Sequence, residues 1–389
     1  MSETNLFTQG LPHAQAAIEV ATRLRDRTKL ESVHVIPTGV LGFEGQEAEL
    51  GESEYGAPPF SERLGAIASD YVAYELAFSI LMRIYELPKL SGPENKIFQI
   101  GIAAGSTVRS IINSFRLPEG FAEKIRNSEI KIQVCPLVIG PMPETASSAG
   151  FLASLFTKTL QQALRDDEKV KFMPLSKKIP QEDGYKLAML EEVRRVRDAD
   201  PSILSLDYKK IDDKSKRQEI AKLRKSQLRL DWILTGVGSN GKGQLKEHID
   251  LRYKDDPKLK KKIEEDAIGD ICSRIYDKNG EELAKADGDK FVGISFEWLR
   301  FLANDRHIKH AQIENRTSGQ HNYKITAVTG GDDKYDAIFA LVQNTIEAQR
   351  HKSIDSKYLC PFNSLVTDEI TARRLLRDIH KKYVFSKSE

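Results

Sequence analysis

Residues 328–334, Val-Thr-Gly-Gly-Asp-Asp-Lys, decide the fold class of this chain. An apolar run at 325–328 predicts a buried strand, and the apolar pattern after Lys334 predicts a helix. Because glycine has no Cβ, an anion can approach the backbone N–H groups of Gly330 and Gly331 at the start of this helix. Lys334 follows within one turn, where its ammonium can reach the same anion. The junction therefore predicts a phosphate cradle; the alternative is that the glycines only turn the chain.

Similar junctions recur along the chain. Apolar runs predict strands that end in turns containing glycine, and these turns lie at 101–107, 140–143 and 236–243. In the first, Ser106 or Thr107 can cap the following helix. Strands that alternate with helices predict an α/β fold with a Rossmann-like, mainly parallel sheet and helices on both faces. Ligands of such folds bind beyond the carboxyl ends of the strands. The candidate ligand residues at these ends are Gly105, Ser106, Thr107, Gly140, Gly236, Gly238, Gly330, Gly331 and Lys334.

The remaining pattern predicts further elements. Helices are expected at 12–29, 61–86, 146–164, 218–228 and 368–380, and strands at 33–36, 97–100, 130–138, 170–173, 231–235, 291–294 and 364–366. The apolar face of the 61–86 helix should be buried, Phe78 included. A Gly/Glu/Pro-rich loop is expected at 39–60 and a charged helical segment at 176–215. The lysine run at 258–262 predicts a solvated helix face rather than a nucleic-acid contact.

Composition limits the function classes. Charged residues make up 30% of 389 residues, yet the net charge is only +2, which argues against a strongly basic nucleic-acid-binding protein. Three widely spaced cysteines predict buried thiols in a reducing compartment, and no metal site is expected, at His307 and His310 included. No apolar stretch reaches the roughly 18 residues that span a bilayer, and the N-terminus lacks a signal-peptide pattern. We therefore expect a cytoplasmic protein.

Asp270 is the candidate that differs from the others. It stands among Ile268, Ile271 and Cys272, and a carboxylate in such surroundings is costly unless it has a partner. It can accept hydrogen bonds from sugar hydroxyls or, alternatively, from backbone N–H groups in a tight turn. Catalytic patterns are weak, because no histidine accompanies a nucleophile and there is no Gly-x-Ser-x-Gly. The Gly-x-Gly-x-x-Gly at 236–241 lacks a following apolar helix, so no nucleotide cofactor is expected.

The order of motifs resembles the effector domain of SorC/DeoR-type sugar-binding regulators of bacterial transcription. Ala-Ile-Gly-Asp-Ile-Cys-Ser-Arg-Ile-Tyr-Asp at 267–277 is the most similar block. The other blocks are Ile-Gly-Ile-Ala-Ala-Gly-Ser-Thr at 100–107, Val-Cys-Pro-Leu-Val-Ile-Gly at 134–140, Leu-Thr-Gly-Val-Gly-Ser at 234–239, Val-Gly-Ile-Ser at 292–295, Ala-Val-Thr-Gly-Gly-Asp-Asp-Lys at 327–334 and Leu-Val-Thr-Asp-Glu-Ile-Thr-Ala-Arg at 365–373. The resemblance covers roughly residues 20–380.

This resemblance implies a fold similar to ribose-5-phosphate isomerase and glucosamine-6-phosphate deaminase. It implies that a phosphorylated sugar binds, with its phosphate near Ser106, Thr107 and Lys334 and its hydroxyls near Asp270 and the 236–238 turn. The chain departs from the family in leaving no room for a helix-turn-helix before residue 20, so direct DNA binding is not expected.

We therefore expect two regions in the chain and one of three alternative functions. Residues 1–60 should form an N-terminal helix, strand and loop, and 61–389 the sugar-phosphate-binding domain, with a charged helical segment at about 176–228. The favoured function is a non-catalytic sensor of a phosphorylated sugar or related small anion. It would signal through its oligomeric state, a homodimer or homotetramer, or through a partner protein, and transcriptional regulation is the expected setting. The alternatives are a sugar-phosphate isomerase or deaminase, and a DNA-binding regulator with a non-standard surface.

Overall fold

The structure is a computed structural model that describes residues 12–41, 59–89, 96–139, 147–172, 230–239, 246, 249–250, 253, 256–283, 292–294, 296, 299–300, 302–303, 323–351 and 360–385. Its centre is a seven-stranded sheet in which every neighbouring pair is parallel, as the sequence predicted. Crossing the sheet, the strands are β1 (Ser32–Ile36), β12 (Ser364–Asp368), β11 (Lys324–Val328), β6 (Leu230–Thr235), β2 (Ile97–Ile102), β3 (Lys131–Pro136) and β5 (Val170–Phe172).

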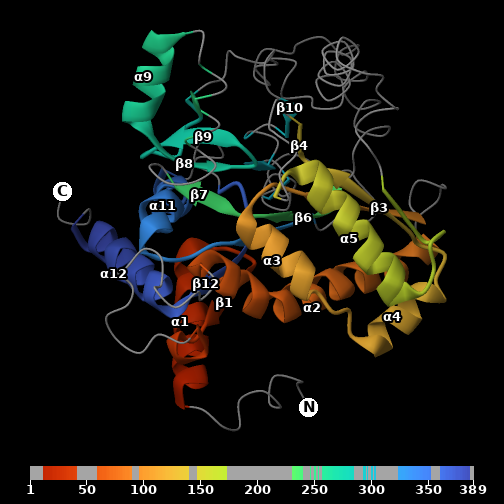
Figure 1. Ribbon diagram of the computed structural model, residues 1–389. Helices are drawn as coiled ribbons and strands as arrows, with labels where there is room; N and C mark the ends of the chain where they lie inside the picture. The colour runs from red at the N-terminus through yellow and green to blue at the C-terminus, as the bar shows by residue number, and fades with distance from the viewer. Residues whose placement is uncertain are drawn as a thin grey trace, which may run out of the picture.

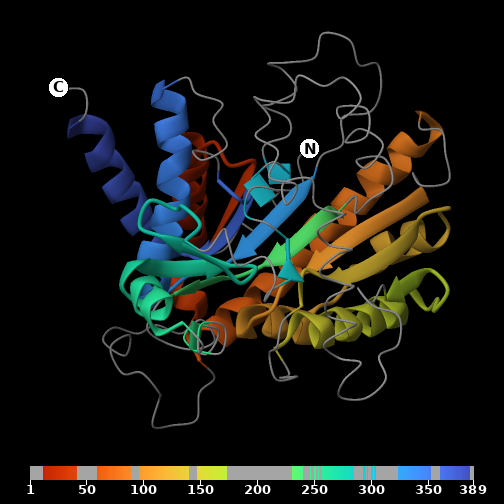
Figure 2. The same ribbon diagram turned by 90° about the horizontal axis from the view of Figure 1, so that it is seen from above.

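Helices cover both faces of this sheet (Figures 1 and 2). Because successive strand residues point to opposite faces, neighbours such as Leu365 and Val366 belong to different hydrophobic clusters. The Leu365 cluster includes side chains of α1 (Pro12–Thr28), α11 (Tyr335–His351) and α12 (Glu369–Phe385). The Val366 cluster includes side chains of α2 (Phe60–Glu86), α3 (Ser106–Ser114), α4 (Glu119–Arg126) and α5 (Ala149–Leu164). The sheet is therefore the middle layer of three.

Two small antiparallel sheets extend the main one. The first joins β7 (Val237–Ser239), β8 (Ala267–Ile271) and β9 (Arg274–Asp277), and α9 (Pro257–Asp266) leads into β8. The β8–β9 hairpin turns at Cys272 and Ser273, both with positive φ (49° and 60°), as a type I′ turn requires. The second pairs β4 (Val138–Ile139) with β10 (Val292–Gly293). Two expectations are thus corrected: 237–239 is a strand rather than part of a turn, and the 130–138 strand leaves the main sheet after Pro136.

The α2 helix is the longest described helix and packs against the sheet and α3. Its predicted buried face is confirmed at Leu64, Val72 and Leu76, but Phe78 is 61% exposed, so its predicted burial is wrong. By length and apolar composition α2 is the one described helix that could cross a membrane, so the expectation that no segment reaches this length is wrong. In the structure 56% of its most apolar window is buried, as in the core helix of a folded domain.

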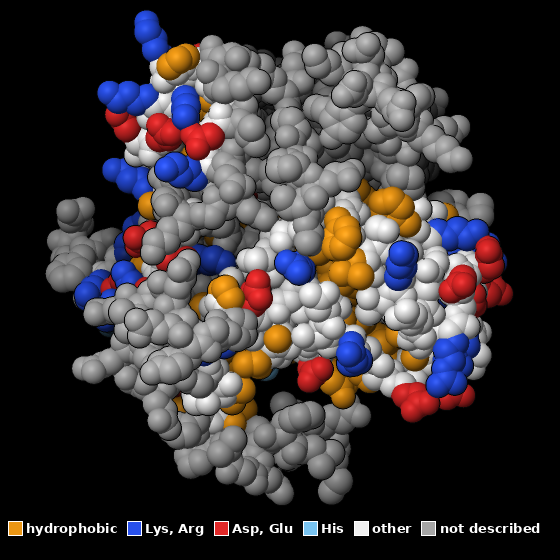
Figure 3. All heavy atoms as spheres, in the orientation of Figure 1, with side chains coloured by type: hydrophobic (Ala, Val, Ile, Leu, Met, Phe, Trp, Pro, Cys, Tyr) orange, Lys and Arg blue, Asp and Glu red, His pale blue; other side chains and the backbone are white. Residues whose placement is uncertain are grey.

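The short 3-10 helices are η2 (Thr38–Leu41), η4 (Leu87–Lys89) and η6 (Asp332–Lys334). The α9 helix confirms that the 258–262 lysines lie on a helix with a solvated face, since Lys258, Lys261 and Lys262 are exposed. Around α9, Figure 3 shows acidic and basic side chains intermingled. The predicted 218–228 helix, the 176–215 segment, most of the 39–60 loop and the Gly140 turn lie outside the described residues.

Candidate functional site

Three adjacent strands end at the same edge of the sheet and carry most of the predicted ligand residues. In the order β11, β6, β2 they lead into 330–334, 236–239 and 105–107, respectively. Because neighbouring strands are about 4.8 Å apart, the ends of β11 and β2 are separated by about 10 Å. Topology therefore brings these three segments together, and Gly140 is the one predicted residue that falls outside the described chain.

The N-terminus of α3 presents free backbone donors. Gly105 occupies the N-cap position with φ 134°, and no side chain caps the helix, so the expected cap by Ser106 or Thr107 is wrong. The first bond into the helix runs from Arg109 N to Gly105 O (3.0 Å). In the described structure the N–H groups of Ser106 and Thr107 have no acceptor. They point out of the helix with its positive dipole end, which favours an anion.

The glycine pair after β11 does not form the predicted cradle at Gly331. Gly331 N donates to Asp368 Oδ2 (2.9 Å) and Thr371 Oγ1 (3.0 Å). Asp368 also accepts from Thr371 N through its other oxygen (2.9 Å), which caps the start of α12. A Cβ at Gly330 would overlap Asp368 Oδ2, so this glycine is needed for close packing. The Gly331 amide is thus already paired with a carboxylate inside the protein.

Lys334, at the end of η6, is the cation of this edge. Its side chain is half-buried, and burial lowers the pKa of its ammonium, while Asp333 and Asp270 raise it. Within the described part of the chain the ammonium has neither a hydrogen-bond acceptor nor an ion-pair partner within 4 Å. A half-buried cation that lacks a direct partner favours the approach of an anion.

Asp270 lies opposite Gly238 in the β7–β8 pair. Its carboxylate lies over Gly238 so closely that a Cβ there would overlap Oδ1. Oδ2 accepts from Ser273 N (3.2 Å). Burial raises the pKa of Asp270 to about 6, against the lowering effects of the Ser273 N–H and of Lys334. The alternative that Asp270 accepts from a backbone N–H in a tight turn is confirmed at Oδ2, and acceptance from a sugar hydroxyl stays a prediction.

The small sheet is fixed to the helix that follows Lys334. Tyr276 Oη donates to Ala337 O (3.1 Å), and a Cβ at Gly269 would meet both Ala337 Cβ and Tyr276 Oη at 2.7 Å. Thr329 Oγ1 also donates to Val237 O (3.5 Å). These contacts keep Asp270 and Lys334 close enough that the charge of each shifts the pKa of the other.

Several residues at this edge were not predicted. Asp368 is 3% exposed. Thr367 is fully buried, and its hydroxyl has no hydrogen-bond partner among the described residues and lies 3.2 Å from a Cβ position built on Gly330. The N-terminus of α2 reaches the same place: the Phe60 ring lies 3.1 Å from a Cβ position at Gly331, and Ser61 Oγ lies 3.4 Å from Ser106 Oγ. The sequence signal for Asp368 was its position at a helix start, where acidic caps are common.

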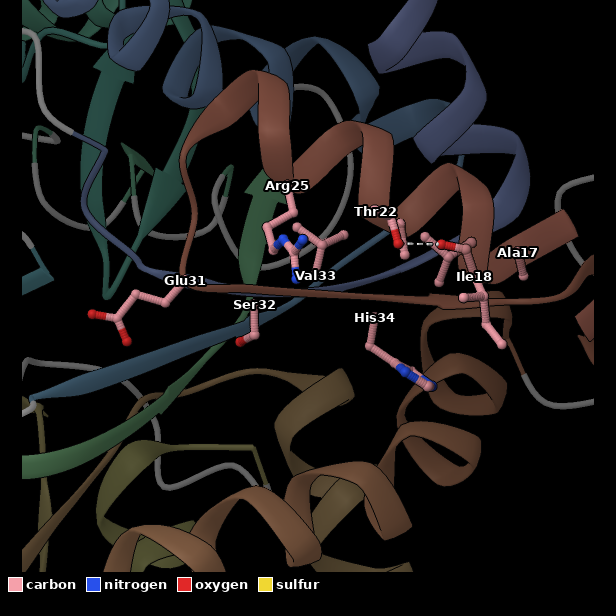
Figure 4. A pocket seen from close by; sticks show the side chains of 10 residues that line it. Ala17, Ile18, Thr22, Arg25, Glu31, Ser32, Val33 and His34 are labelled. Atoms are coloured by element: carbon pink, nitrogen blue, oxygen red, sulfur yellow. Dashed lines mark hydrogen bonds between the residues drawn. The ribbon is translucent and has the colours of Figure 1, made fainter. Parts of the chain in front are cut away.

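A separate pocket of about 200 Å³ lies between α1 and the edge strand β1, away from these strand ends (Figure 4). Its polar lining includes Arg25, Glu31 and His34. Burial lowers the pKa of His34 to about 4, so the ring is neutral, and it stacks on Tyr71 with ring centroids 4.2 Å apart. Arg25 is paired with Asp26 (3.1 Å). The pocket therefore offers an anion no free cation among its described residues.

Among the described residues there is neither a group of metal ligands nor an exposed cysteine. No group of three or more His, Cys, Asp or Glu side chains is placed to hold a metal ion there, and His307 and His310 are not described. All three cysteines are free and buried, and burial raises the pKa of Cys272 to about 12.

One family model matches part of this chain. Residues 212–306 match the family model described as "Putative sugar-binding domain". This range contains Gly236, Gly238 and Asp270, whereas Ser106, Thr107 and Lys334 lie outside it. A comparison with curated proteins gave no match. The match confirms the resemblance to sugar-binding domains that the sequence indicated.

Solved structures similar to this chain are transcriptional regulators. A transcriptional regulator from Streptococcus pneumoniae is 16% identical with a TM-score of 0.48, over 94% of this chain and 98% of that one. A DeoR family regulator from Listeria monocytogenes is 18% identical with a TM-score of 0.47, over 92% and 99%. The full-length sorbitol operon regulator SorC from Klebsiella pneumoniae is 16% identical with a TM-score of 0.46, over 92% and 81%.

Proposed function

We propose that this protein is a non-catalytic sensor that binds a phosphorylated sugar at the β11–β6–β2 edge. The phosphate lies on the N-terminus of α3, where it accepts from Ser106 and Thr107 N–H and pairs with Lys334. The sugar hydroxyls donate to Asp270. The sugar class follows from the family match at 212–306 and from the related regulators of sugar operons. We infer the phosphate from the free N–H donors and Lys334, and we also propose a cytoplasmic location.

The observation that carries this proposal is the separation of charge along the edge. Free N–H donors and a half-buried ammonium lie at the edge together with a partly enclosed carboxylate. An anion alone would be repelled by Asp270, and a neutral sugar alone would leave Lys334 unpaired. A molecule that carries a phosphate at one end and hydroxyls at the other satisfies both groups.

Calorimetric titration with a panel of pentose and hexose phosphates tests the proposal. Lys334→Ala should weaken the binding of a phosphorylated sugar at least about tenfold, since it removes a charge-assisted contact. It should leave the binding of the same sugar without phosphate unchanged, and it should not unfold the protein. The control is Lys158→Ala, which removes an exposed lysine on α5. Equal affinity of wild type and Lys334→Ala for the phosphorylated sugar would contradict the phosphate assignment.

A second function, isomerisation or deamination of the sugar phosphate, is favoured by one observation. A pKa of about 6 suits a carboxylate that must accept a proton near neutral pH, and Asp270 has that value. Incubation of the bound compound with protein, followed by mass spectrometry and NMR, separates the two functions. Product that disappears in Asp270→Asn would establish an enzyme; unchanged compound would leave the sensor.

A further inference from the structure

Around Lys334, two acids face one base. Asp333 and Asp270 both lie close enough to raise the pKa of the Lys334 ammonium. Within the described part of the chain, Lys334 is also the one cation whose charge lowers the pKa of Asp270. Neither carboxylate comes within 4 Å of the ammonium, so no ion pair neutralises these groups among the described residues. The charges of Lys334 and Asp270 are therefore both available to a ligand.

Asp270 keeps one carboxylate oxygen open for that ligand. Oδ2 accepts from Ser273 N (3.2 Å), and the described residues supply no other hydrogen bond to this carboxylate. Oδ1 lies over Gly238, where the missing Cβ leaves room for it. The side chain is half-buried, and Oδ1 is not one of the fully enclosed side-chain atoms that lack a partner. A ligand can therefore reach Oδ1 from outside.

The best match for a half-buried carboxylate without a cation is a donor that carries a positive charge. A sugar hydroxyl returns a hydrogen bond but no charge, whereas an ammonium returns both. Hydrogen bonds that involve charged groups are about twice as strong as those between neutral groups. Burial raises the pKa of Asp270 to about 6, because its surroundings replace water poorly, and a cation beside the carboxylate would reverse that shift.

We propose that the ligand of this site is the phosphate ester of an amino sugar, whose ammonium binds Asp270 Oδ1 in place of one hydroxyl. Its phosphate lies on the α3 N-terminus and Lys334, so this inference rests on the proposed function and narrows its ligand class. A phosphate ester brings a charge of about −1.5 to −2 at pH 7 to an edge where two acids already face one lysine. The ammonium offsets part of that charge and gives Asp270 the cation that it lacks.

Calorimetric titration with matched pairs of sugar phosphates tests this inference. The pairs are glucosamine-6-phosphate with glucose-6-phosphate, galactosamine-6-phosphate with galactose-6-phosphate, and glucosamine-1-phosphate with glucose-1-phosphate, and the members of each differ only in one ammonium or hydroxyl. In at least one pair the amino sugar should bind at least about tenfold more tightly at pH 7, because its bond to Asp270 joins two charged groups. If no amino sugar exceeds its partner, the inference is wrong. The proposed function fails separately, if no member of any pair binds or if Lys334→Ala weakens none of them.

Two variants that replace an acid by its amide show whether the preference comes from Asp270. Asp270→Asn loses the charge but keeps an oxygen that can accept from Ser273 N, so the hairpin turn is retained and the preference for the amino sugar should disappear. Asp333→Asn is the matched control, because it removes an exposed acid beside the same lysine. It should keep most of the preference, since water and salt screen an exposed charge. A preference that persists in Asp270→Asn, or an equal loss in both variants, would overturn the contact between the ammonium and Asp270.

Discussion

At the scale of single residues, the site depends on a backbone segment that lies so close to a neighbouring side chain that only glycine fits there. The β7 backbone at Gly238 lies under the carboxylate of Asp270, so a methyl group there must displace Oδ1. At Gly236, two residues earlier, the nearest atom to a Cβ position is Val328 O at 3.7 Å, an ordinary contact. The two glycines were predicted together as ligand residues, but their surroundings give them different tolerance to substitution.

Gly238→Ala should therefore weaken sugar-phosphate binding at least about tenfold and cost about 1–3 kcal/mol of unfolding free energy, the usual cost of overpacking. Gly236→Ala should change the unfolding free energy by less than about 1 kcal/mol, because a Cβ fits there. Urea unfolding and calorimetric titration of the two variants provide the measurement. If Gly236→Ala were the more damaging substitution, the placement of Asp270 over β7 would be incorrect.

Asp270 should make binding depend on pH. Its pKa of about 6 means that the carboxylate loses its charge as the pH falls below 6, and with it part of its strength as an acceptor. The ratio of wild-type to Asp270→Asn affinity should therefore fall between pH 7.5 and pH 5. The phosphate also titrates near pH 6, but its effect cancels in the ratio because both proteins bind the same ligand. Calorimetry across this range measures the ratio, and a constant ratio would exclude Asp270 as an ionised acceptor.

The same group affects stability in the opposite direction to an ordinary surface carboxylate. Its folded pKa lies above its unfolded value of about 3.9, so the folded chain holds a proton that the unfolded chain has released. Its contribution to stability is present below about pH 4 and is lost as the pH rises through about 6. Relative to wild type, Asp270→Asn should consequently gain unfolding free energy from pH 4 to pH 7. Urea unfolding at both values measures this change.

Single residues also mark the limit of prediction from sequence. Lys334 and Asp270 could be proposed as ligand residues because a lysine after a glycine turn and a carboxylate in an apolar run are local patterns. The occupation of the Gly331 amide by Asp368 was not, because the partner comes from a different strand 37 residues later. The cap of α3 was also misassigned: Ser106 and Thr107 have the right chemistry, but the left-handed backbone of Gly105 occupies the cap position.

At the scale of elements, the spacing of hydrophobic residues along the sequence predicted the long helices and the buried strands well. It missed β7, because a three-residue strand with glycine at its centre has too little pattern to distinguish it from a turn. It also predicted wrongly that Phe78 is buried, because the spacing of apolar residues alone does not say which side of an apolar helix packs on the sheet. A buried polar contact also joins α2 to the sheet: Arg83 pairs with Asp231, which also accepts from Gln99 N (2.7 Å) where the β2–β6 register shifts.

Arg83→Met should cost about 3–5 kcal/mol of unfolding free energy, because it leaves the carboxylate of Asp231 buried without its cation. Adding Asp231→Asn should recover part of this loss, since an amide oxygen can still accept from Gln99 N and carries no charge. Lys96→Met is the control: its pair with Glu129 is 53% and 72% exposed, and such pairs contribute at most about 1 kcal/mol. Denaturant unfolding of the wild type and the three variants gives the comparison. Equal losses for Arg83→Met and Lys96→Met would mean that the buried pair is not a structural element.

At the scale of the whole molecule, the site exists only because the chain order and the sheet order differ. Residues 105–107 and 330–334 are more than two hundred positions apart, yet β6 alone separates their strands. The sequence predicted that the strand ends would meet at one edge, since parallel strands share their direction. It could not predict which ends are neighbours, because strand order follows from long-range packing rather than from local pattern.

A ligand that joins the α3 N-terminus and Lys334 to Asp270 should therefore stabilise the protein more than its phosphate and its sugar do separately. At one hundred times its dissociation constant, a phosphorylated sugar should add about 2.7 kcal/mol of unfolding free energy. Inorganic phosphate and the unphosphorylated sugar, each at the same concentration and then both together, should add much less, because neither ties the α3 N-terminus to Asp270 and the joined molecule loses its freedom only once. Differential scanning calorimetry measures the four cases on one protein preparation. If phosphate and free sugar together matched the phosphorylated sugar, the two ends of the edge would be independent sites rather than one.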